Sequence, residues 1–330
     1  MRRRDLTATL LLSSLARPAL AQAPSSAPWP NRPVRIVVAF PAGGGTDILA
    51  RMLQDPLAAA LGGATVIIEN RGGGSGMIAA EHVARSAPDG YTLLWNITTH
   101  VQAPVVLRRF PYDPIRDFAF VARVGLGPIG FMVGPAVPAQ VTTLKEFIDW
   151  GKGRPLSFGN FGSGSTSHAF GALFAQEAGL DATQVAYRGE APMLQDNLGG
   201  QFHGGFHSTA VTNDMIAAGR IRPLATGGPV RTPSLADRIP TFLELGFSQR
   251  FGFVGFTGVM APAGVPQPLL DRIVGAFRRV LADPAMDARL RALDLITGWV
   301  EPAEFRSFTE QIMRQWVEMA DSLDLYQSTG

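Results

Sequence analysis

Three glycine-rich turns each close a predicted strand and open a predicted helix, at 42–47, 72–76 and 162–168. The first amides of a helix have no acceptor within the helix, and they lie at the positive end of its dipole. Glycine lets a ligand approach those amides closely. The chemistry that such turns offer is therefore the capture of an anion, at the end of the strands where ligands bind in open α/β sheets.

The first and third turns carry the strongest signals for a ligand. Three consecutive glycines at 43–45 are more than a turn requires, whereas Asp47 in the first helical turn suits a capping role beside the dipole. The third turn gathers four hydroxyl side chains within 163–167 around one helix start. The competing interpretation is structural, with glycine present to turn the chain and serine or threonine to cap a helix. The turn at 72–76 fits that structural interpretation better.

Other chemistries find less support. Gly74-x-Gly76-x-x-Ala79 matches a relaxed dinucleotide-binding pattern, but the next strand ends at Trp95-Asn96 without the acid that would bind a ribose. The sequence has no G-x-S-x-G nucleophile elbow and no phosphate-loop lysine. It has no cysteine, and the pair His203 and His207 lacks an evident third metal ligand. We therefore predict no cofactor and no metal.

The N-terminus has the three parts of a secretory signal peptide. Arginines at 2–4 precede an apolar stretch and the cleavage pattern Ala19-Leu20-Ala21, and the adjacent arginines leave both general and twin-arginine export open. Removing residues 1–21 takes four arginines and one aspartate from 29 basic and 27 acidic side chains, which leaves 25 and 26. This near-neutral mature chain gives no support for a nucleic-acid partner. We expect a periplasmic protein, cleaved near Ala21, with no membrane-spanning segment.

Apolar runs that alternate with helices predict an α/β fold with strands buried on both faces. Strands are expected at 34–40, 65–68, 91–95, 120–124, 130–133, 156–159, 184–187, 203–206, 221–226 and 254–260. Helices are expected at 46–61, 144–150, 166–178, 193–198, 269–281 and 302–323, with another from the turn at 72–76 to about residue 85.

Two such α/β units predict two lobes with a ligand cleft between them. A flexible leader at 22–33 precedes lobe 1, which comprises 34–124 and 227–300. Lobe 2 comprises 125–226, and a C-terminal helix at 301–330 packs on the lobes. The chain is expected to cross between lobes near 125–128 and 223–228, and to be a monomer.

Short motifs recur in order along nearly all of the mature chain. They are Trp29-Pro30-x-x-Pro33-Val34-Arg35, Phe40-Pro41-x-Gly43-Gly44-Gly45-Thr46-Asp47, Glu69-Asn70-Arg71, Ala87-Pro88-Asp89-Gly90-Tyr91, Pro111-Tyr112-Asp113-Pro114, Gly164-x-x-x-His168, Tyr187-x-Gly189-x-Ala191-Pro192, Leu198-Gly199-Gly200-Gln201 and Ala261-Pro262-Ala263-Gly264-x-Pro266. In this order they resemble the Bug family, the periplasmic substrate-binding receptors associated with tripartite tricarboxylate transporters. The resemblance implies a two-lobed, hinge-closing fold of the type II periplasmic-binding-protein class. It also implies that ligand carboxylates are held by the 43–47 loop and by the 163–168 helix start.

The turns and the resemblance together give the predicted ligand-binding residues. They are Ala42, Gly43, Gly44, Gly45, Thr46, Asp47, Thr98, Ser163, Ser165, Thr166, His168, Tyr187, Gly189 and His207. One departure bears on the ligand, because His207-Ser208 stands where the family usually shows an acidic pair such as Asp-Asn. Without an acid to meet an ammonium group, we predict a carboxylate other than an amino acid, either a di- or tricarboxylate or an aromatic acid. Trp95 and Tyr187, at strand ends, are also expected near it.

The leading hypothesis is a solute-binding protein, not an enzyme, that closes over a small carboxylate and presents it to a membrane transporter or a sensor kinase. The alternative is a periplasmic hydrolase that uses the same glycine- and serine-rich loops. A nucleophile–base pair inside the cleft would favour the hydrolase.

Overall fold

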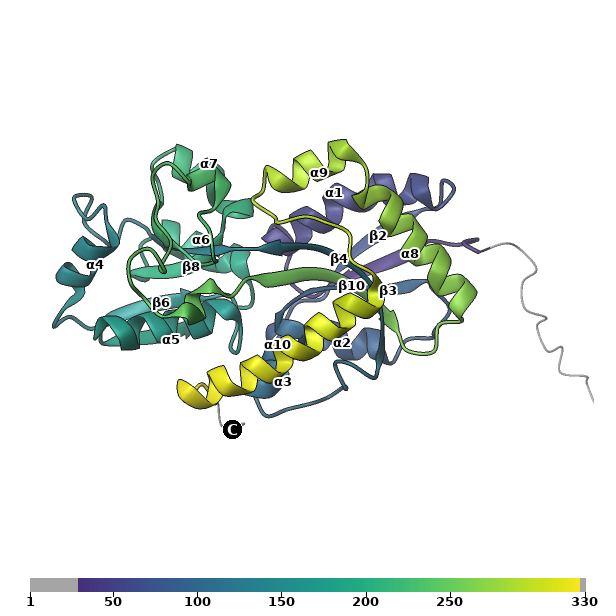
Figure 1. The fold of residues 1–330 in the computed structure, drawn as a ribbon, viewed down its shortest axis with the longest axis horizontal. Coiled ribbons are helices and arrows are strands. Elements are labelled where there is room, and N and C mark those ends of the chain that lie inside the picture. The colour runs from purple at the N-terminus through teal and green to yellow at the C-terminus, as the bar shows by residue number, and fades with distance from the viewer. Residues whose placement is uncertain (1–28, 327–330) are drawn as a thin grey trace, which may run out of the picture.

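Two five-stranded sheets lie end to end in the computed structural model, which describes residues 29–326 (Figure 1). The predicted signal peptide at 1–21 lies outside these residues. The first sheet has the strand order β2-β1-β3-β10-β4 and the second β7-β6-β8-β5-β9. The strands are β1 (Val34–Val38), β2 (Val66–Asn70), β3 (Thr92–Ile97), β4 (Phe118–Gly127), β5 (Ile129–Val133), β6 (Leu156–Asn160), β7 (Ala182–Ala186), β8 (Gly204–Ser208), β9 (Arg222–Thr226) and β10 (Gly255–Pro262). We call the part built on each sheet the first and the second lobe.

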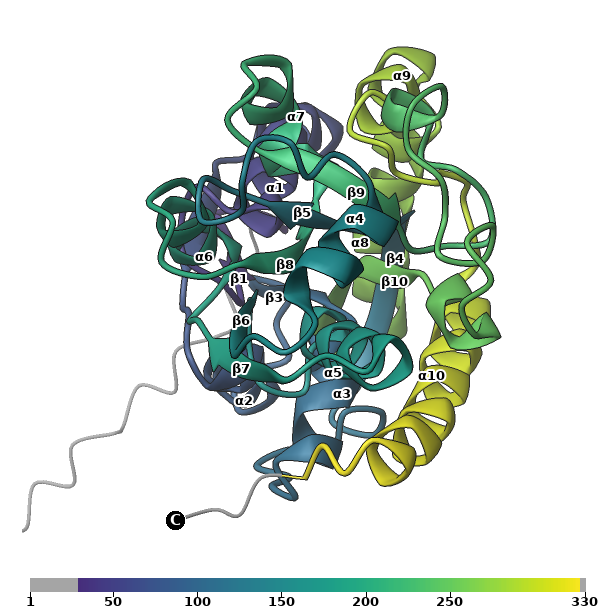
Figure 2. The same cartoon turned by 90° about the vertical axis from the view of Figure 1, so that its left-hand side faces the viewer.

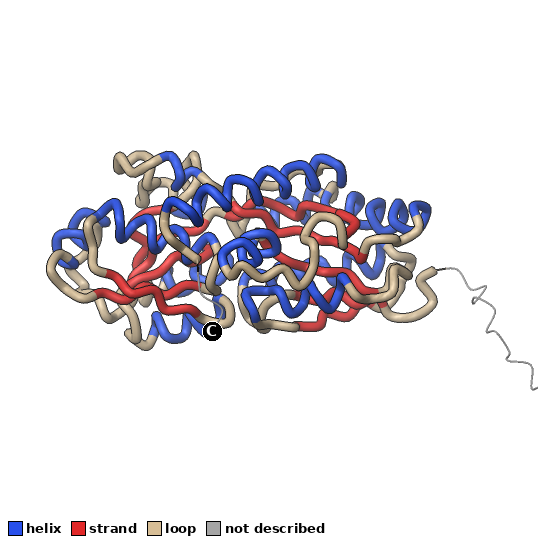
Figure 3. Tube along the Cα trace, turned by 90° about the horizontal axis from the view of Figure 1, so that it is seen from below, coloured by secondary structure: helices blue, strands red, loops and turns tan. Residues whose placement is uncertain are grey.

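Helices flank both sheets (Figure 3). They are α1 (Gly45–Ala60), α2 (Met77–Ala84), α3 (Thr99–Val106), α4 (Leu144–Gly151), α5 (Thr166–Ala178), α6 (Glu190–Leu198), α7 (Thr209–Ala217), α8 (Gln267–Leu281), α9 (Pro284–Arg291) and α10 (Pro302–Ser322), with short 3-10 turns at Gly74–Gly76, Pro233–Leu235 and Gln249–Gly252. None of the helices within 29–326 has both the length and the apolar content needed to cross a membrane. The two-lobed α/β fold expected from the sequence is confirmed.

The strands that carry the glycine-rich turns are parallel. β1 pairs in parallel with β2 and β3, and β6 pairs in parallel with β7 and β8. β10 is antiparallel to both of its neighbours, β3 and β4, and β5 is antiparallel to β8 and β9. Because parallel strands end at one edge of a sheet, the turns that follow β1, β3, β6, β7 and β8 meet between the lobes.

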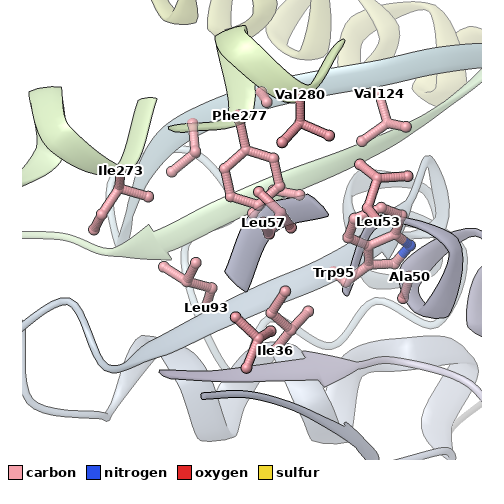
Figure 4. Packing of buried hydrophobic residues seen from close by; sticks show 14 of the residues in the cluster. Ile36, Ala50, Leu53, Leu57, Leu93, Trp95, Val124, Ile273, Phe277 and Val280 are labelled. Atoms are coloured by element: carbon pink, nitrogen blue, oxygen red, sulfur yellow. The ribbon is translucent and has the colours of Figure 1, made fainter. Parts of the chain in front are cut away.

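The first lobe is held by a core between its sheet and two amphipathic helices. Leu57 of α1 and Phe277 of α8 lie over the sheet, close to Ile36 of β1 and Leu93 of β3 (Figure 4). Trp95 of β3 belongs to the same core and is fully buried. These strands read as continuous apolar runs because both faces of the sheet are covered.

The second lobe is held by stacked phenylalanines. The fully buried ring of Phe131 has its centroid 4.8–5.4 Å from those of four others, which are Phe147, Phe158, Phe174 and Phe206. Gly204 on β8 makes room for it, because a Cβ there would lie 2.4 Å from the Phe131 ring. The aromatic residues of this lobe are therefore chiefly core residues.

The chain crosses between lobes at two places, and one differs from expectation. The first crossing joins β4 to β5 and lies within the expected 125–128. The return was expected at 223–228, but the chain stays with the second lobe until after Phe251. Phe242 and Phe251 stack at 4.2 Å in the second core, and Thr226 bridges to Thr241 beside β9. The burial of these two rings holds 227–253 on the second lobe instead of the first.

The C-terminal helix α10 runs along the molecule from the first lobe toward the second (Figures 1 and 2). Its Trp316 is buried in a cluster with Val105 and Val106 of α3 and Ala169 of α5. The helix therefore contacts both lobes.

Truncation of Phe131 to alanine should lower the free energy of unfolding by about 3–5 kcal/mol, because it leaves a cavity among four rings. Urea denaturation followed by circular dichroism measures this loss. Phe110→Ala is the matched control, since Phe110 is 52% exposed and its truncation should change stability by less than about 0.5 kcal/mol. Equal losses in the two variants would contradict the placement of Phe131 at the centre of the second core.

Candidate ligand-binding site

A cavity of about 100 Å³ lies between the lobes, at the carboxyl ends of the parallel strands. Its wall is mostly apolar, and residues of both lobes contribute to it, including Phe40, Leu49, Ile97, Ile129, Phe161, Phe253, Phe256, Leu293 and Leu295. A few polar residues interrupt this wall, namely Thr46, Thr98, Gln102, Thr166, Glu190, Ser208 and Thr257. An apolar wall with a few placed polar groups is the usual form of a small-molecule site.

Five helices begin at this cavity. α1 begins at Gly45, α5 at Thr166 and α6 at Glu190, and all three residues line the cavity. α3 and α7 follow the lining residues Thr98 and Ser208. Among the described residues that line the cavity there is no lysine, arginine or histidine. The positive potential for an anion therefore comes from helix N-termini and not from cationic side chains.

The first glycine-rich turn reaches the cavity with half of its predicted residues. Gly44, Gly45 and Thr46 line it, whereas Ala42 and Gly43 are exposed and lie outside the lining. The close approach expected at the glycines is found at Gly45, because a Cβ there would lie 3.1 Å from Ser208 Oγ and 3.2 Å from Glu190 Oε2. The groups that approach it are thus side chains of the other lobe.

Asp47 holds this turn in shape. Its carboxylate accepts hydrogen bonds from Gly43 N (3.0 Å), Arg51 Nε (3.0 Å) and Asn70 Nδ2 (2.9 Å). Burial by itself would raise the pKa of Asp47, but the hydrogen bonds from these three groups hold it below its usual value. Asp47 is therefore an ionised structural residue outside the cavity lining.

The third turn contributes Thr166. Gln102 Nε2 donates to Thr166 Oγ1 at 3.0 Å, which joins α3 of the first lobe to α5 of the second inside the cavity wall. Ser165 instead caps α5 by accepting from His168 N at 3.2 Å. His168 Nδ1 accepts from Gly164 N at 3.2 Å, and burial lowers the pKa of His168 to about 4. Ser165, His168 and Ser163 all lie outside the lining and shape the turn from behind.

The remaining predicted residues divide in the same way. Thr98 lines the cavity and accepts from Phe256 N at 2.7 Å. Tyr187 donates to Asp196 Oδ2 at 2.9 Å, and neither it nor Gly189 belongs to the lining. Trp95, expected near the ligand, lies in the first core instead.

His207 does not line the cavity. Its Nε2 lies 3.0 Å from Asn197 Nδ2, and the residue, which belongs to β8, is fully buried. Burial lowers the pKa of His207 to about 3, so the ring is neutral. The prediction of His207 as a ligand-binding residue is therefore not supported by its position, because its neighbour Ser208 lines the cavity instead.

Glu190, Ser208, Gln102 and Thr257 are the polar lining residues that the predicted site did not include. Glu190 Oε1 accepts from Ser208 N (2.6 Å) and Ser208 Oγ (2.9 Å), and its Oε2 from the same hydroxyl (2.8 Å). The Gly45 N–H also hydrogen bonds to this carboxylate. An acid in the first turn of a helix is common in sequence, so no local signal distinguished Glu190 from an exposed capping residue.

Among the described residues that line the cavity, no serine is paired with a histidine base. No histidine belongs to its lining, and the hydroxyl of Ser208 donates to a carboxylate. A serine–histidine contact does occur elsewhere, between Ser157 Oγ and His203 Nδ1 at 3.1 Å, but that nitrogen also accepts from Ser157 N at 3.0 Å. Within the described part of the chain, no group of three histidine, aspartate or glutamate side chains is suited to a metal ion.

Known proteins resemble this chain both in sequence and in fold. The family model described as the tripartite tricarboxylate transporter family receptor matches residues 49–325. A UPF0065 protein of Bordetella bronchiseptica is 32% identical over 291 residues, which cover 86% of this chain and 83% of the relative. The structure of the periplasmic binding protein BugD is 31% identical with a TM-score of 0.85, covering 90% of this chain and 99% of its own. The R. palustris protein Rpa4515, solved with adipate, is 32% identical with the same TM-score and coverage.

The family match extends over most of the chain, and the fold agrees with it in both lobes. The resemblance to Bug receptors is therefore confirmed, and this chain belongs to the receptor family of the tripartite tricarboxylate transporters.

Proposed function

We propose that this protein is a periplasmic solute-binding receptor that captures a small carboxylate between its lobes and delivers it to a membrane transporter or a sensor kinase. The observation that carries the proposal is the convergence of five helix N-termini on one cavity built by both lobes. Helix N-termini at a mostly apolar wall attract an anion without a cationic side chain. A carboxylate is the anion that the family relatives support, since Rpa4515 was solved with adipate.

The apolar wall indicates the kind of carboxylate. The wall holds few polar groups and seven phenylalanine and leucine side chains, which are Phe40, Leu49, Phe161, Phe253, Phe256, Leu293 and Leu295. A ligand with an apolar body, such as a medium-chain dicarboxylate or an aromatic acid, buries its carbon against this wall. A ligand rich in hydroxyl groups would leave several of them unpaired there.

Glu190, and not the pair at 207–208, is the residue that disfavours an amino-acid ligand. An acid does stand in the cavity, but both of its oxygens already accept hydrogen bonds from Ser208, and Gly45 adds a third donor. A ligand ammonium group would compete with these donors for the same oxygens. We therefore keep the proposal that the ligand is not an amino acid.

Capture requires both lobes. Gln102 and Thr166 meet across the cavity, as do Gly45 and Glu190, so a ligand seated among them contacts both lobes only when they are closed. Because the ligand then binds the closed state better than the open one, it shifts the population toward closure.

A thermal-shift screen of the mature chain against carboxylates tests the proposal. Saturation at about 100 times Kd adds about 2.7 kcal/mol to the free energy of unfolding, which raises Tm by several degrees. Adipate and benzoate should raise Tm, and glutarate should raise it more than glutamate does. A preference for glutamate over glutarate would contradict the exclusion of amino acids, and turnover of an ester without any shift would favour the hydrolase.

Replacement of Thr166 by alanine should weaken ligand binding by about 1–3 kcal/mol, because it removes a buried hydroxyl and leaves Gln102 without its partner. Isothermal titration with the best acid of the screen measures the change in Kd. Thr183→Ala, at an exposed position of β7, is the control and should leave Kd unchanged. Unchanged affinity in both variants would place the site away from the start of α5.

A further inference from the structure

Glu190 is the only acidic residue among the described residues that line the cavity. Its carboxylate comes from the first turn of α6 in the second lobe and is held by the main chain and hydroxyl of Ser208. These contacts hold the Glu190 carboxylate between the start of α6 and the start of α7. The carboxylate is thus a built part of the cavity wall and not a free surface group.

The same carboxylate faces the first lobe. The Gly45 N–H, the first amide of α1, hydrogen bonds to it, and a Cβ on Gly45 would lie 3.2 Å from Oε2. This amide belongs to the turn that the anion argument assigns to a ligand carboxylate. Glu190 therefore already presents a carboxylate where a ligand is expected to place its own.

No charged side chain offsets this group. The titratable residues on the elements around it are Asp47, Arg51 and the exposed Asp55 of α1, His207 of β8, Asp214 of α7, Asp196 of α6, Arg188 before α6 and Asp294 beside Leu293 and Leu295. Asp47 pairs with Arg51, Asp196 accepts from Tyr187, and Asp294 accepts from Ser234. His207 is neutral, and Arg188 and Asp214 are exposed.

Burial is the largest influence on the carboxyl group. It raises the pKa of Glu190 to about 7, while the hydrogen bonds from Ser208 and Gly45 act in the opposite direction. A second carboxylate in the same apolar cavity would repel the ionised form and raise this pKa further.

We propose that Glu190 selects the charge state of the complex, so that a ligand carboxylate is captured only together with one proton, which passes from solvent to a Glu190 oxygen. The inference rests on the proposed function and adds proton coupling to it. The neutral carboxyl group keeps one oxygen as acceptor for Ser208 and can donate its own proton to the ligand carboxylate. The five helix N-termini then stabilise a single negative charge, which is that of the ligand carboxylate.

The direction of the pH dependence follows from linkage. The complex binds one more proton than the free protein wherever Glu190 is ionised before binding, so affinity falls as pH rises above about 7. Between about pH 6.5 and about pH 8.5 the wild-type Kd should rise about 25-fold, if Glu190 stays protonated in the complex.

Isothermal titration of adipate and benzoate at these two pH values, in buffers of different ionisation enthalpy, measures both Kd and proton uptake. Wild type should take up nearly one proton per ligand at the higher pH. Glu190→Gln mimics the protonated group, so its Kd should match the low-pH wild-type value at both pH values, with no proton uptake. Glu318→Gln, an exposed position on α10, should behave as wild type.

Ser208→Ala provides an independent variant. Loss of the hydroxyl removes hydrogen bonds that favour the ionised form, so the pH at which affinity falls should move upward. Binding by wild type with the same Kd at both pH values and no proton uptake would overturn the inference and leave the receptor function intact. Absence of binding by either acid to wild type and to Glu190→Gln would instead overturn the proposed function, and the inference with it.

Discussion

The first amides of a helix must find acceptors, and in this protein five helices bring that requirement to one enclosed space. α1 and α3 open from the first sheet, and α5, α6 and α7 open from the second. Two sheets whose parallel strands end face to face are what place them there. The mostly apolar wall lowers the local dielectric constant, which strengthens the attraction of these N-termini for an anion. The preference of the cavity for an anion depends on this single arrangement.

The glycines of the turns serve contact between lobes as much as contact with a ligand. A Cβ on Gly189 would lie 2.8 Å from Pro41, one on Gly162 would lie 2.8 Å from Ser75, and one on Gly164 would lie 3.0 Å from Ala103. In each pair the two residues come from different lobes. Larger residues at these glycines would hold the lobes apart, and the amides could not converge. The turn at 72–76, which the sequence analysis considered structural, takes part in this contact through Ser75.

The parts of the fold that local pattern determines were predictable from sequence. Each expected strand corresponds to a strand within a few residues, because buried runs of apolar residues carry their own signal. The helix Thr99–Val106 was not expected, since it contains Pro104 and β-branched residues and is stabilised by burial against α10. The attachment of 227–253 to the second lobe depends on Phe242 and Phe251, whose partners lie far away in sequence.

The candidate site shows the same division between local and distant signals. Glycine-rich turns identified Gly44, Gly45, Thr46 and Thr166 because those residues act through the backbone and the helix start on which they lie. Glu190 and Gln102 act through partners on other elements, and no residue spacing in the sequence indicates which residues will become such partners.

His207 and Glu190 show why charge in this cavity cannot be assigned from residue type. Burial lowers the pKa of the histidine to about 3 and raises that of the glutamate to about 7. Burial thus favours the neutral form of both His207 and Glu190, because each charged form loses its hydration when it is buried. The sequence placed His207 among the ligand-binding residues, whereas in the structure His207 is neutral and lies outside the cavity lining, and the lining contains Glu190, whose pKa burial raises to about 7. The charge that the ligand meets is therefore set by helix N-termini and by one proton.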